Sequence, residues 1–223
     1  MLYQPSSAVS NEREIPLIGI GLRHPHYQEA LQGASSIDFV EIHAENYFAE
    51  GGIVPELLND IAAIYPVSLH STSMGLGSAE GINQAYLERL HGLINRINPI
   101  LISDHACFTW SRINGHSVHA GDLLPIEFTE QSLDLMSQNI DRVQQKLGRQ
   151  VLVENLSAYL EFKFSQMSET EFLSGLVERT GCGLLVDLNN LLVNAHNFSD
   201  ENALNVAQKW LFEIPEQAIG EIH

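Results

Sequence analysis

The sequence predicts an α/β fold, a TIM-type (β/α)8 barrel that is C-terminally incomplete and has about seven strands. Three observations support this prediction: short apolar runs alternate with longer amphipathic segments, no two strands follow each other directly, and most apolar runs end on an acid or a histidine. Strict alternation of strand and helix is typical of right-handed βα units around a parallel sheet. Because a complete barrel usually needs about 250 residues, we expect the last βα unit to be missing.

Seven short apolar segments are expected to form buried strands. They are residues 17–21, 38–43, 67–70, 99–104, 151–154, 184–187 and 219–223. The helices expected between them are a short one ending near residue 32 and longer ones over 55–65, 80–97, 129–147, 168–179 and 199–212. Pro55 suits the first position of its helix, Gly148 suits the position after a helix end, and Ser168 with Glu171 forms a capping box.

Three polar segments lack helical or strand periodicity. Residues 1–16 are expected to be a loose lead-in to a single domain over residues 17–223. Residues 106–128 are expected to form a long irregular loop, and such a loop inside a compact domain is usually functional, as a lid or a substrate groove. Residues 188–198 carry four asparagines and a histidine, and we expect them to be a site-forming segment between a strand and the next helix.

The composition limits the partners. The chain has 28 acidic and 11 basic residues and a net charge of −17. This charge repels phosphate groups, so binding to nucleic acid or to an anionic membrane surface is not expected, whereas cations are attracted. Cys107 and Cys182 are far apart and fit a reducing compartment better than a disulfide scaffold. With no secretory signal pattern and no apolar run of about 20 residues, we expect a cytoplasmic protein.

Acids and histidines follow the expected strands where each strand ends. In a barrel the carboxyl ends of parallel strands meet in one cup, and buried carboxylates are costly unless they are paired or bound to metal. The candidate metal ligands are His70, His105, Glu154, Asp187, His196, Glu221 and His223. Further possible ligands, or residues that orient the ligands, are Glu41, His43, Asp104, Asn155 and Asn190.

Imidazole and carboxylate groups without a cysteine cluster favour iron, manganese or catalytic zinc over structural zinc. With so many candidates, more than one ion is expected, bridged by a carboxylate such as Glu154 or Asp187. A single histidine at a strand end is more often structural, so this hypothesis depends on the repetition of the pattern.

Several polar residues have simpler interpretations. Asp104 fits a hydrogen bond to a neighbouring loop as well as it fits a metal site, and Asn155 and Asn190 fit loop-fixing hydrogen bonds better than ligation. Four other histidines are expected in surface loops, where contact with a substrate is the less common role. They are His24, His26, His116 and His119.

Long motifs in the chain resemble those of a known family. They are HAENYF (43–48), SLHSTSMGLGS (68–78), SDHACF (103–108), LLP (123–125), VENLSAYL (153–160), VDLNNLLVNAHNF (186–198) and EIH (221–223). In sequence and in order they are similar to the multinuclear non-haem iron-dependent oxidative enzymes, relatives of the methanobactin-biosynthesis oxidase that were long known only as an uncharacterised bacterial protein family. This sequence departs from the family by ending at EIH, where the relatives continue through a last βα unit.

The resemblance implies a TIM-type barrel that holds two or three iron ions. It also implies use of O2 to modify cysteine residues of a ribosomally made precursor peptide, with a partner protein that presents the peptide. A mixed set of imidazoles and carboxylates, which leaves open positions on iron, agrees with this implication. Any ligand supplied by the last βα unit of the relatives would be absent here.

Two other functions remain open from the sequence. One is a divalent-metal isomerase or hydrolase of the xylose-isomerase-like barrel type, which would use zinc or manganese on similar strand-end groups. The other is a non-catalytic barrel that binds metal or a partner. Bound zinc without iron would favour the first, and bound iron without O2 consumption would favour the second.

Overall fold

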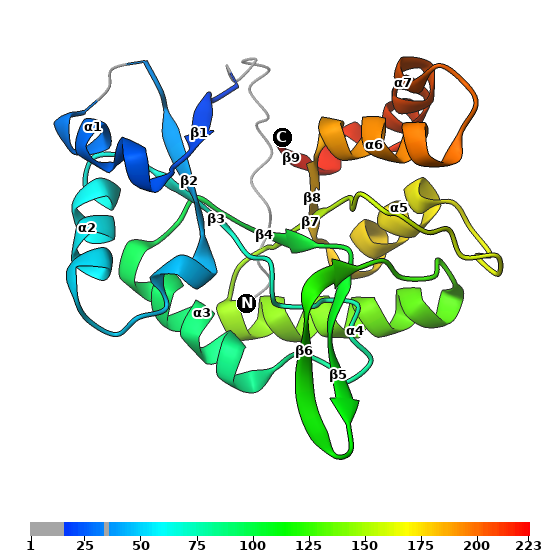
Figure 1. The fold of residues 1–223 in the computed structure, drawn as a ribbon, viewed down its shortest axis with the longest axis horizontal. Helices are drawn as coiled ribbons and strands as arrows, with labels where there is room; N and C mark the ends of the chain where they lie inside the picture. The colour runs from blue at the N-terminus through cyan, green and yellow to red at the C-terminus, as the bar shows by residue number, and fades with distance from the viewer. Residues whose placement is uncertain (1–15, 34–35) are drawn as a thin grey trace, which may run out of the picture.

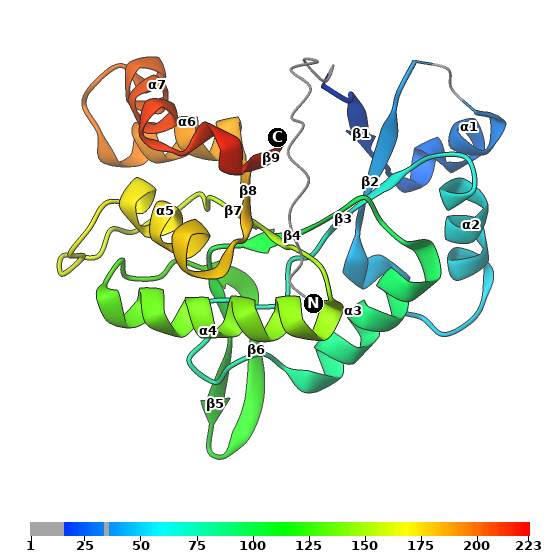
Figure 2. The same cartoon turned by 180° about the vertical axis from the view of Figure 1, so that it is seen from behind.

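The computed structural model of the protein describes residues 16–33 and 36–223, so the lead-in expected over residues 1–16 lies, apart from residue 16, outside the described part. Its centre is a parallel sheet with the strand order β1-β2-β3-β4-β7-β8-β9. The strands are β1 (Gly19–Gly21), β2 (Phe39–His43), β3 (Val67–His70), β4 (Leu101–His105), β7 (Leu152–Glu154), β8 (Gly183–Val186) and β9 (Ile219–Ile222). The sheet curls into a half-barrel with helices around it, and β1 and β9 are its outer strands (Figures 1 and 2). The expected TIM-type arrangement with seven parallel strands is confirmed.

The helices connect successive strands of this sheet. They are η1 (His24–His26), α1 (Tyr27–Gln32), η2 (Ala44–Tyr47), α2 (Ile53–Ala62), α3 (Gln84–Ile97), α4 (Glu130–Leu147), α5 (Glu169–Thr180), α6 (Leu188–Phe198), α7 (Ala203–Glu213) and η3 (Glu216–Ala218). The expected capping box of Ser168 and Glu171 begins α5, and Gly148 ends α4 in the left-handed conformation, with φ 63°. Both features satisfy backbone groups that helix ends leave without partners.

Three helices begin at positions other than those expected. α2 begins at Ile53, so Pro55 is the third residue of the helix and not the first. Proline is tolerated at this position because the backbone N–H that it lacks would have no acceptor in the first turn. α3 and α7 begin directly after Asn83 and Asn202, whose side-chain oxygens accept backbone N–H groups of the first turn. These asparagine caps place the two helix starts a few residues later than the sequence predicts.

The long irregular loop expected over residues 106–128 is not present. Most of it forms an antiparallel hairpin of β5 (Phe108–Ile113) and β6 (His116–Leu124), which projects from the half-barrel (Figure 1). Asn114 and Gly115 make the turn with φ of 51° and 82°, the conformation that an Asn-Gly hairpin turn requires. His116 and His119 therefore lie on a strand, and His24 and His26 lie on η1, not in loops.

The segment over residues 188–198 is also regular. It is the helix α6, and the carboxylate of Asp187 caps it by accepting the backbone N–H of Asn190 at 2.7 Å. Asparagine is a weak helix former because its side chain competes for backbone hydrogen bonds. On α6 the side chains of Asn190, Asn194 and Asn197 bond instead to the loop that follows β7, which removes this competition.

A buried apolar core between sheet and helices holds the strand ends in place. Leu69, Ile102, Met136 and Phe172 are among its largest fully buried side chains. Each such side chain contributes about 1.5–3 kcal/mol through removal of apolar surface from water. Among the described helices, none combines the length and the apolar character that a membrane crossing requires.

Candidate metal centre

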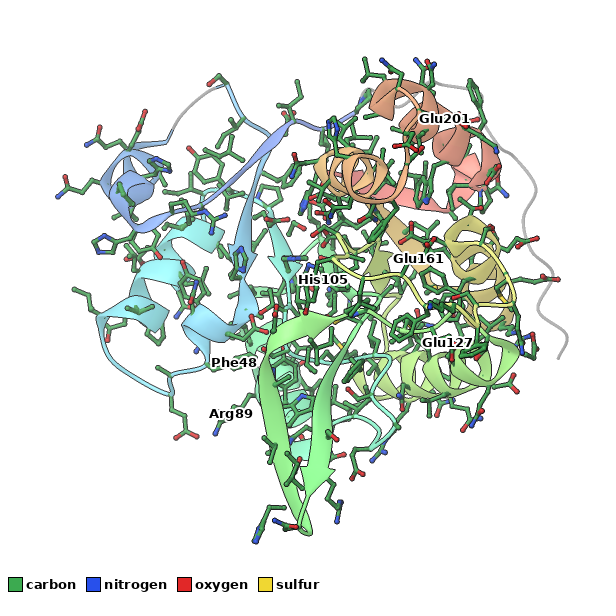
Figure 3. The ribbon with its side chains drawn as sticks, turned by 45° about the vertical axis from the view of Figure 1, so that its right-hand side comes forward. Phe48, Arg89, His105, Glu127, Glu161 and Glu201 are labelled. Atoms are coloured by element: carbon green, nitrogen blue, oxygen red, sulfur yellow. The ribbon has the colours of Figure 1, made fainter. Side chains whose placement is uncertain are left out.

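Polar side chains from neighbouring strands meet at the carboxyl end of the sheet. In the parallel register His43 pairs with His70, and His105 pairs with Glu154, so β2 ends level with β3 and β4 ends level with β7. His70 pairs with Ser103, so β4 and β7 extend two residues further. His105 lies near the middle of the molecule, where these strands end (Figure 3). The register of the sheet thus places residues far apart in the chain beside one another.

His70, His105 and Glu154 form the most buried group of this site. Their relative exposures are 5%, 6% and 3%. Oε2 of Glu154 lies 3.4 Å from Nε2 of His70 and 3.2 Å from Nε2 of His105. Three potential metal-binding atoms from three adjacent strands therefore converge.

Two further groups extend this one, because Glu154 and His223 each belong to more than one group. Glu154, Asp187 and His223 form the second group, and Glu41, Glu221 and His223 form the third. Within each group one donor atom from every residue lies within 4.8 Å of the others. Six of the seven candidate ligands, together with Glu41, are thus gathered in one region.

His196 is the candidate that the structure does not bring to this region. It belongs to none of the three groups and is exposed on the last part of α6. Asp187 caps that helix, so His196 lies nine residues further, or about 13 Å along the axis. Its proximity to Asp187 in the sequence motif does not carry over to the fold.

The protonation of these groups follows from burial and from their neighbours. Burial raises the pKa of Glu154 to about 7, against the opposing effects of His105 and His223. Burial, together with nearby imidazoles, lowers the pKa of His70 to about 2. The hydrogen bond to Glu41 is the largest cause that raises the pKa of His223 to about 9. His70 is therefore neutral at neutral pH, the form in which imidazole binds metal.

Two serines that sequence reasoning missed support the candidate ligands. Oγ of Ser103 lies 2.8 Å from Nδ1 of His70, and the hydroxyl of Ser68 donates to Oε2 of Glu221 at 3.0 Å. Ser68 and Ser103 stand two residues before His70 and His105, so each serine shares the face of its strand with a histidine. That alternation was the available signal, but the partner of each serine depends on the register between strands.

Asp104 and His43 lie beside the groups without belonging to them. The buried carboxylate of Asp104 accepts the backbone N–H groups of Met74 at 2.9 Å and of His105 at 2.6 Å. The ring of His43 packs edge-on against His70, with 5.5 Å between the ring centroids. In this structure Asp104 thus makes the loop-fixing hydrogen bond that was one of its two expected roles.

Asparagines attach α6 to the strand ends. Asn155 bonds the backbone of Asp187 on both sides, accepting its N–H at 2.8 Å and donating to its carbonyl at 3.1 Å. Asn190 donates to the carbonyl of Asn155 at 3.0 Å and to Oε1 of Glu154 at 3.4 Å. These bonds fix the loops around Glu154 and Asp187, the role expected for both asparagines.

The donor set fits a transition-metal ion. Oε2 of Glu154 and Nδ1 of His105 are buried and have no hydrogen-bond partner within the described part of the chain. A buried polar atom without a partner costs about 1–3 kcal/mol, and more if it is charged. A cation between the Glu154 oxygen and the Nε2 atoms of His70 and His105 would satisfy the carboxylate, and its ligands would be of the kind that iron, manganese and zinc accept.

Comparison with known proteins gives a family match over nearly the whole chain. Residues 17–223 match the model of the family described as RiPP precursor modification enzyme MbnB/TglH/ChrH. The UPF0276 protein of Rhizorhabdus wittichii is 43% identical over 209 residues, which are 93% of this chain and 72% of that protein. The UPF0276 protein of Psychromonas ingrahamii is 42% identical over 208 residues, which are 92% of this chain and 69% of that protein.

Solved structures agree with the fold. A D-psicose 3-epimerase from Clostridium cellulolyticum H10, with D-tagatose, has a TM-score of 0.55 at 11% identity, covering 93% of this chain and 72% of its own. The 3-keto-D-glucoside 4-epimerase YcjR from E. coli has a TM-score of 0.51 at 13% identity, covering 92% of this chain and 78% of its own. At these identities the similarity concerns the fold alone.

Proposed function

The chain belongs to the family of RiPP precursor modification enzymes MbnB/TglH/ChrH, and from this premise we propose that it is a multinuclear iron-dependent oxidoreductase that uses O2 to modify cysteine residues of a ribosomally made precursor peptide. The family expected from the sequence motifs is confirmed by this match. The observation that carries the proposal is the convergence of His70, His105 and Glu154 around a buried carboxylate oxygen without a hydrogen-bond donor.

We assign the binding of two or three iron ions to the three groups described above. Their members are His70, His105, Glu154, Asp187, Glu41, Glu221 and His223. Glu154 takes part in two of the groups, and the two oxygens of its carboxylate could serve neighbouring ions. His223 also takes part in two groups, but each of its nitrogens could serve only one ion. When bound, iron supplies one-electron redox chemistry and open coordination positions for O2 and a thiolate.

The chain's own residues orient and enclose this site. Ser103 holds the ring of His70 through Nδ1, which directs Nε2 toward Glu154. The carboxylate of Asp104 accepts the backbone N–H groups of Met74, in the loop after β3, and of His105, at the end of β4. It thereby fixes both segments. Asn190 ties the carboxylate of Glu154 to α6. These contacts limit movement of the ligands while a substrate thiol enters.

The peptide substrate and its partner are part of the same proposal. A net charge of −17 suits a peptide that carries positive charge, and the hairpin β5–β6 next to His105 offers a surface for a peptide-presenting partner protein. Both cysteines of the chain are free and buried, so neither competes with the peptide thiol at the surface. We place the reaction in the cytoplasm, where precursor peptides are made.

The test uses the protein loaded with Fe(II) without air, together with the short cysteine-containing peptide and the protein encoded beside its gene. We expect a change in peptide mass and consumption of O2 only when iron, O2 and an intact Glu154 are all present. The variant Glu154→Gln serves as the inactive control. The same product formed in the absence of O2 would contradict the proposal.

The similarity in fold to sugar epimerases favours one second candidate, a zinc- or manganese-dependent isomerase or hydrolase. The same strand-end carboxylates and imidazoles could hold these ions. Metal analysis of the purified protein separates the two candidates, because full zinc or manganese occupancy with no O2 uptake would support the second. Bound iron with no O2 uptake would instead support a non-catalytic barrel.

A further inference from the structure

Two adjoining cavities are lined in part by residues that follow candidate metal ligands in the chain. The larger, of about 350 Å³, is lined by the segment before α4, the loop between β7 and α5, and α6. The smaller, of about 240 Å³, lies between α6 and α7. Glu169, Asn194 and Phe198 line both cavities, so the two spaces meet at these side chains.

The walls of this double cavity are apolar, and its charged groups are acidic. Ile126, Phe128, Leu156 and Met167 line the larger cavity. Glu161, labelled in Figure 3 on the loop before α5, also lines it. No lysine or arginine lines either cavity among the described residues. A ligand for this space therefore needs an apolar stem and a positive or neutral end.

Glu169 is the group at the junction that the proposed chemistry does not use. Its carboxylate accepts the indole N–H of Trp210 at 2.8 Å, and within the described ranges it forms no ion pair. Burial raises its pKa to about 7, against hydrogen bonds from Trp210 and the Leu156 backbone. Lys209 lines a third cavity together with Glu169 but makes no ion pair with it. A carboxylate that has no ion-pair partner among the described residues attracts a cation.

Several residues that line the larger cavity follow candidate ligands closely in the sequence. Ala106 directly follows His105, and Leu156 follows Glu154 by two residues. Asp187 caps α6, and Asn194 lies seven residues further, or about 10 Å along the helix. An extended peptide spans about 3.5 Å per residue, so about three residues connect the metal centre with the cavity.

We propose that this double cavity binds the side chain of a lysine or arginine that stands about three residues from the target cysteine of the peptide, with the aliphatic stem against the apolar walls and the charged end at Glu169. This inference rests on the proposed function for the identity of the ligand. Long basic side chains combine an apolar stem with a charged end, which matches the lining. The cavity thus selects substrates that have a basic residue at this spacing.

The test measures binding of three fluorescently labelled peptides, Cys-Ala-Ala-X, to the iron-free protein by anisotropy. X is lysine, norleucine or glutamate. Norleucine keeps the four-carbon stem of lysine without its charge, and glutamate reverses the charge on a shorter stem. We expect lysine to bind about 10-fold more tightly than norleucine, and glutamate to bind more weakly than both. Glu169→Gln removes the charge but keeps an acceptor for Trp210, and it should abolish the advantage of lysine.

Glu178→Gln is the matched control, because Glu178 is an exposed acid on the same helix, α5. It should retain the preference for lysine. Equal binding of the lysine and norleucine peptides, no binding of any peptide, or a preference that persists in Glu169→Gln would overturn the inference. Because these measurements need neither iron nor O2, their outcome is separate from a failure of the proposed oxidation, which the O2-dependent product assay detects.

Discussion

Nε2 of His223, at the end of β9, lies 2.5 Å from Oε2 of Glu41 in β2, although the two residues are 182 positions apart. Four strands separate β2 from β9 within the sheet, namely β3, β4, β7 and β8. The contact therefore crosses the interior of the half-barrel and does not follow the sheet. Ser68 makes a second such crossing from β3 to Glu221. These contacts fix β9 so that Glu221 and His223 face the strands that carry the other candidate ligands.

Glu41→Gln tests whether this crossing belongs to the metal centre. The change removes one carboxylate from the group that Glu41 forms with Glu221 and His223. It also frees a nitrogen of His223, but the loss of charge and of a donor atom should dominate. We expect iron affinity to fall about 10- to 100-fold, measured by competition with a chelator. Glu56→Gln, at an exposed acid on α2, is the control. An affinity equal to that of the control would mean that Glu41 only positions β9.

Glu154→Gln should change stability and metal binding in opposite directions. Burial raises the pKa of Glu154 to about 7. A carboxyl group with a raised pKa destabilises the folded state fully above the folded pKa and not at all below its unfolded value. In the metal-free protein at pH 8 we therefore expect the variant to be more stable by about 1–3 kcal/mol, measured by urea unfolding with chelator present. The same variant should lose iron, and a loss of stability at pH 8 would contradict this account.

Much of the fold could be predicted because strand and helix leave different periods in the sequence. The strand ends at His43, His70 and Glu154 coincide with the expected ones, since each follows a short apolar run between polar segments. The strand-end pattern also predicted most of the groups that meet, because parallel strands deliver their ends to one edge. To predict that these groups meet, it was enough to know that the strands are parallel neighbours in one sheet.

What could not be predicted depends on contacts between distant segments. α6 is rich in asparagine and was expected to be irregular; it is a helix because those side chains bond to the loop after β7. His196 shares a motif with Asp187, but the helix between them places His196 about 13 Å along the axis from Asp187. The roles of Ser68 and Ser103 depend on which strand lies opposite, which periodicity does not specify.

Ser103→Ala should weaken iron binding with little effect on the fold. The change removes the hydrogen-bond partner of His70 Nδ1, which lies 2.8 Å from the hydroxyl. The imidazole can then rotate or change tautomer, and we expect iron affinity to fall about 10-fold while stability falls by about 1 kcal/mol. Nitrogen NMR of the histidine rings should show the altered tautomer. Ser103→Thr should restore both properties.

Ser137→Ala is the matched control for this prediction. Ser137 is a buried serine on α4 whose hydroxyl has no hydrogen-bond partner within the described part of the chain. Its removal should leave iron affinity unchanged and stability equal or slightly higher. Equal iron affinities for Ser103→Ala and Ser137→Ala would show that Ser103 does not orient His70.

Asn194→Ala should release the loop that follows β7. The side chain of Asn194 donates to the carbonyl of Leu156 at 2.8 Å and accepts the N–H of Ala158 at 2.7 Å. With both bonds lost, we expect a stability loss of about 1–3 kcal/mol and about 10-fold faster cleavage by trypsin after Lys163, in the same loop. Asn205→Ala, at an exposed position on α7, should leave cleavage unchanged. If cleavage after Lys163 does not accelerate, other contacts hold the loop.

Glu169 should make the protein less stable as the pH rises from about 4.5 to about 7. Burial raises its pKa from the model-peptide value of 4.5 to about 7, so in this window the folded state holds a proton that the unfolded state releases. The free energy of unfolding therefore falls with rising pH and levels off above pH 7. A shift of this size corresponds to at most about 3 kcal/mol, reduced by the part of the side chain that water reaches. The difference in urea stability between Glu169→Gln and the wild type, with chelator present, should grow over this range, whereas Glu178→Gln should show no such growth. A difference that does not vary with pH would mean that the carboxylate of Glu169 is already ionised at pH 5, and that the surrounding groups solvate it as well as water does.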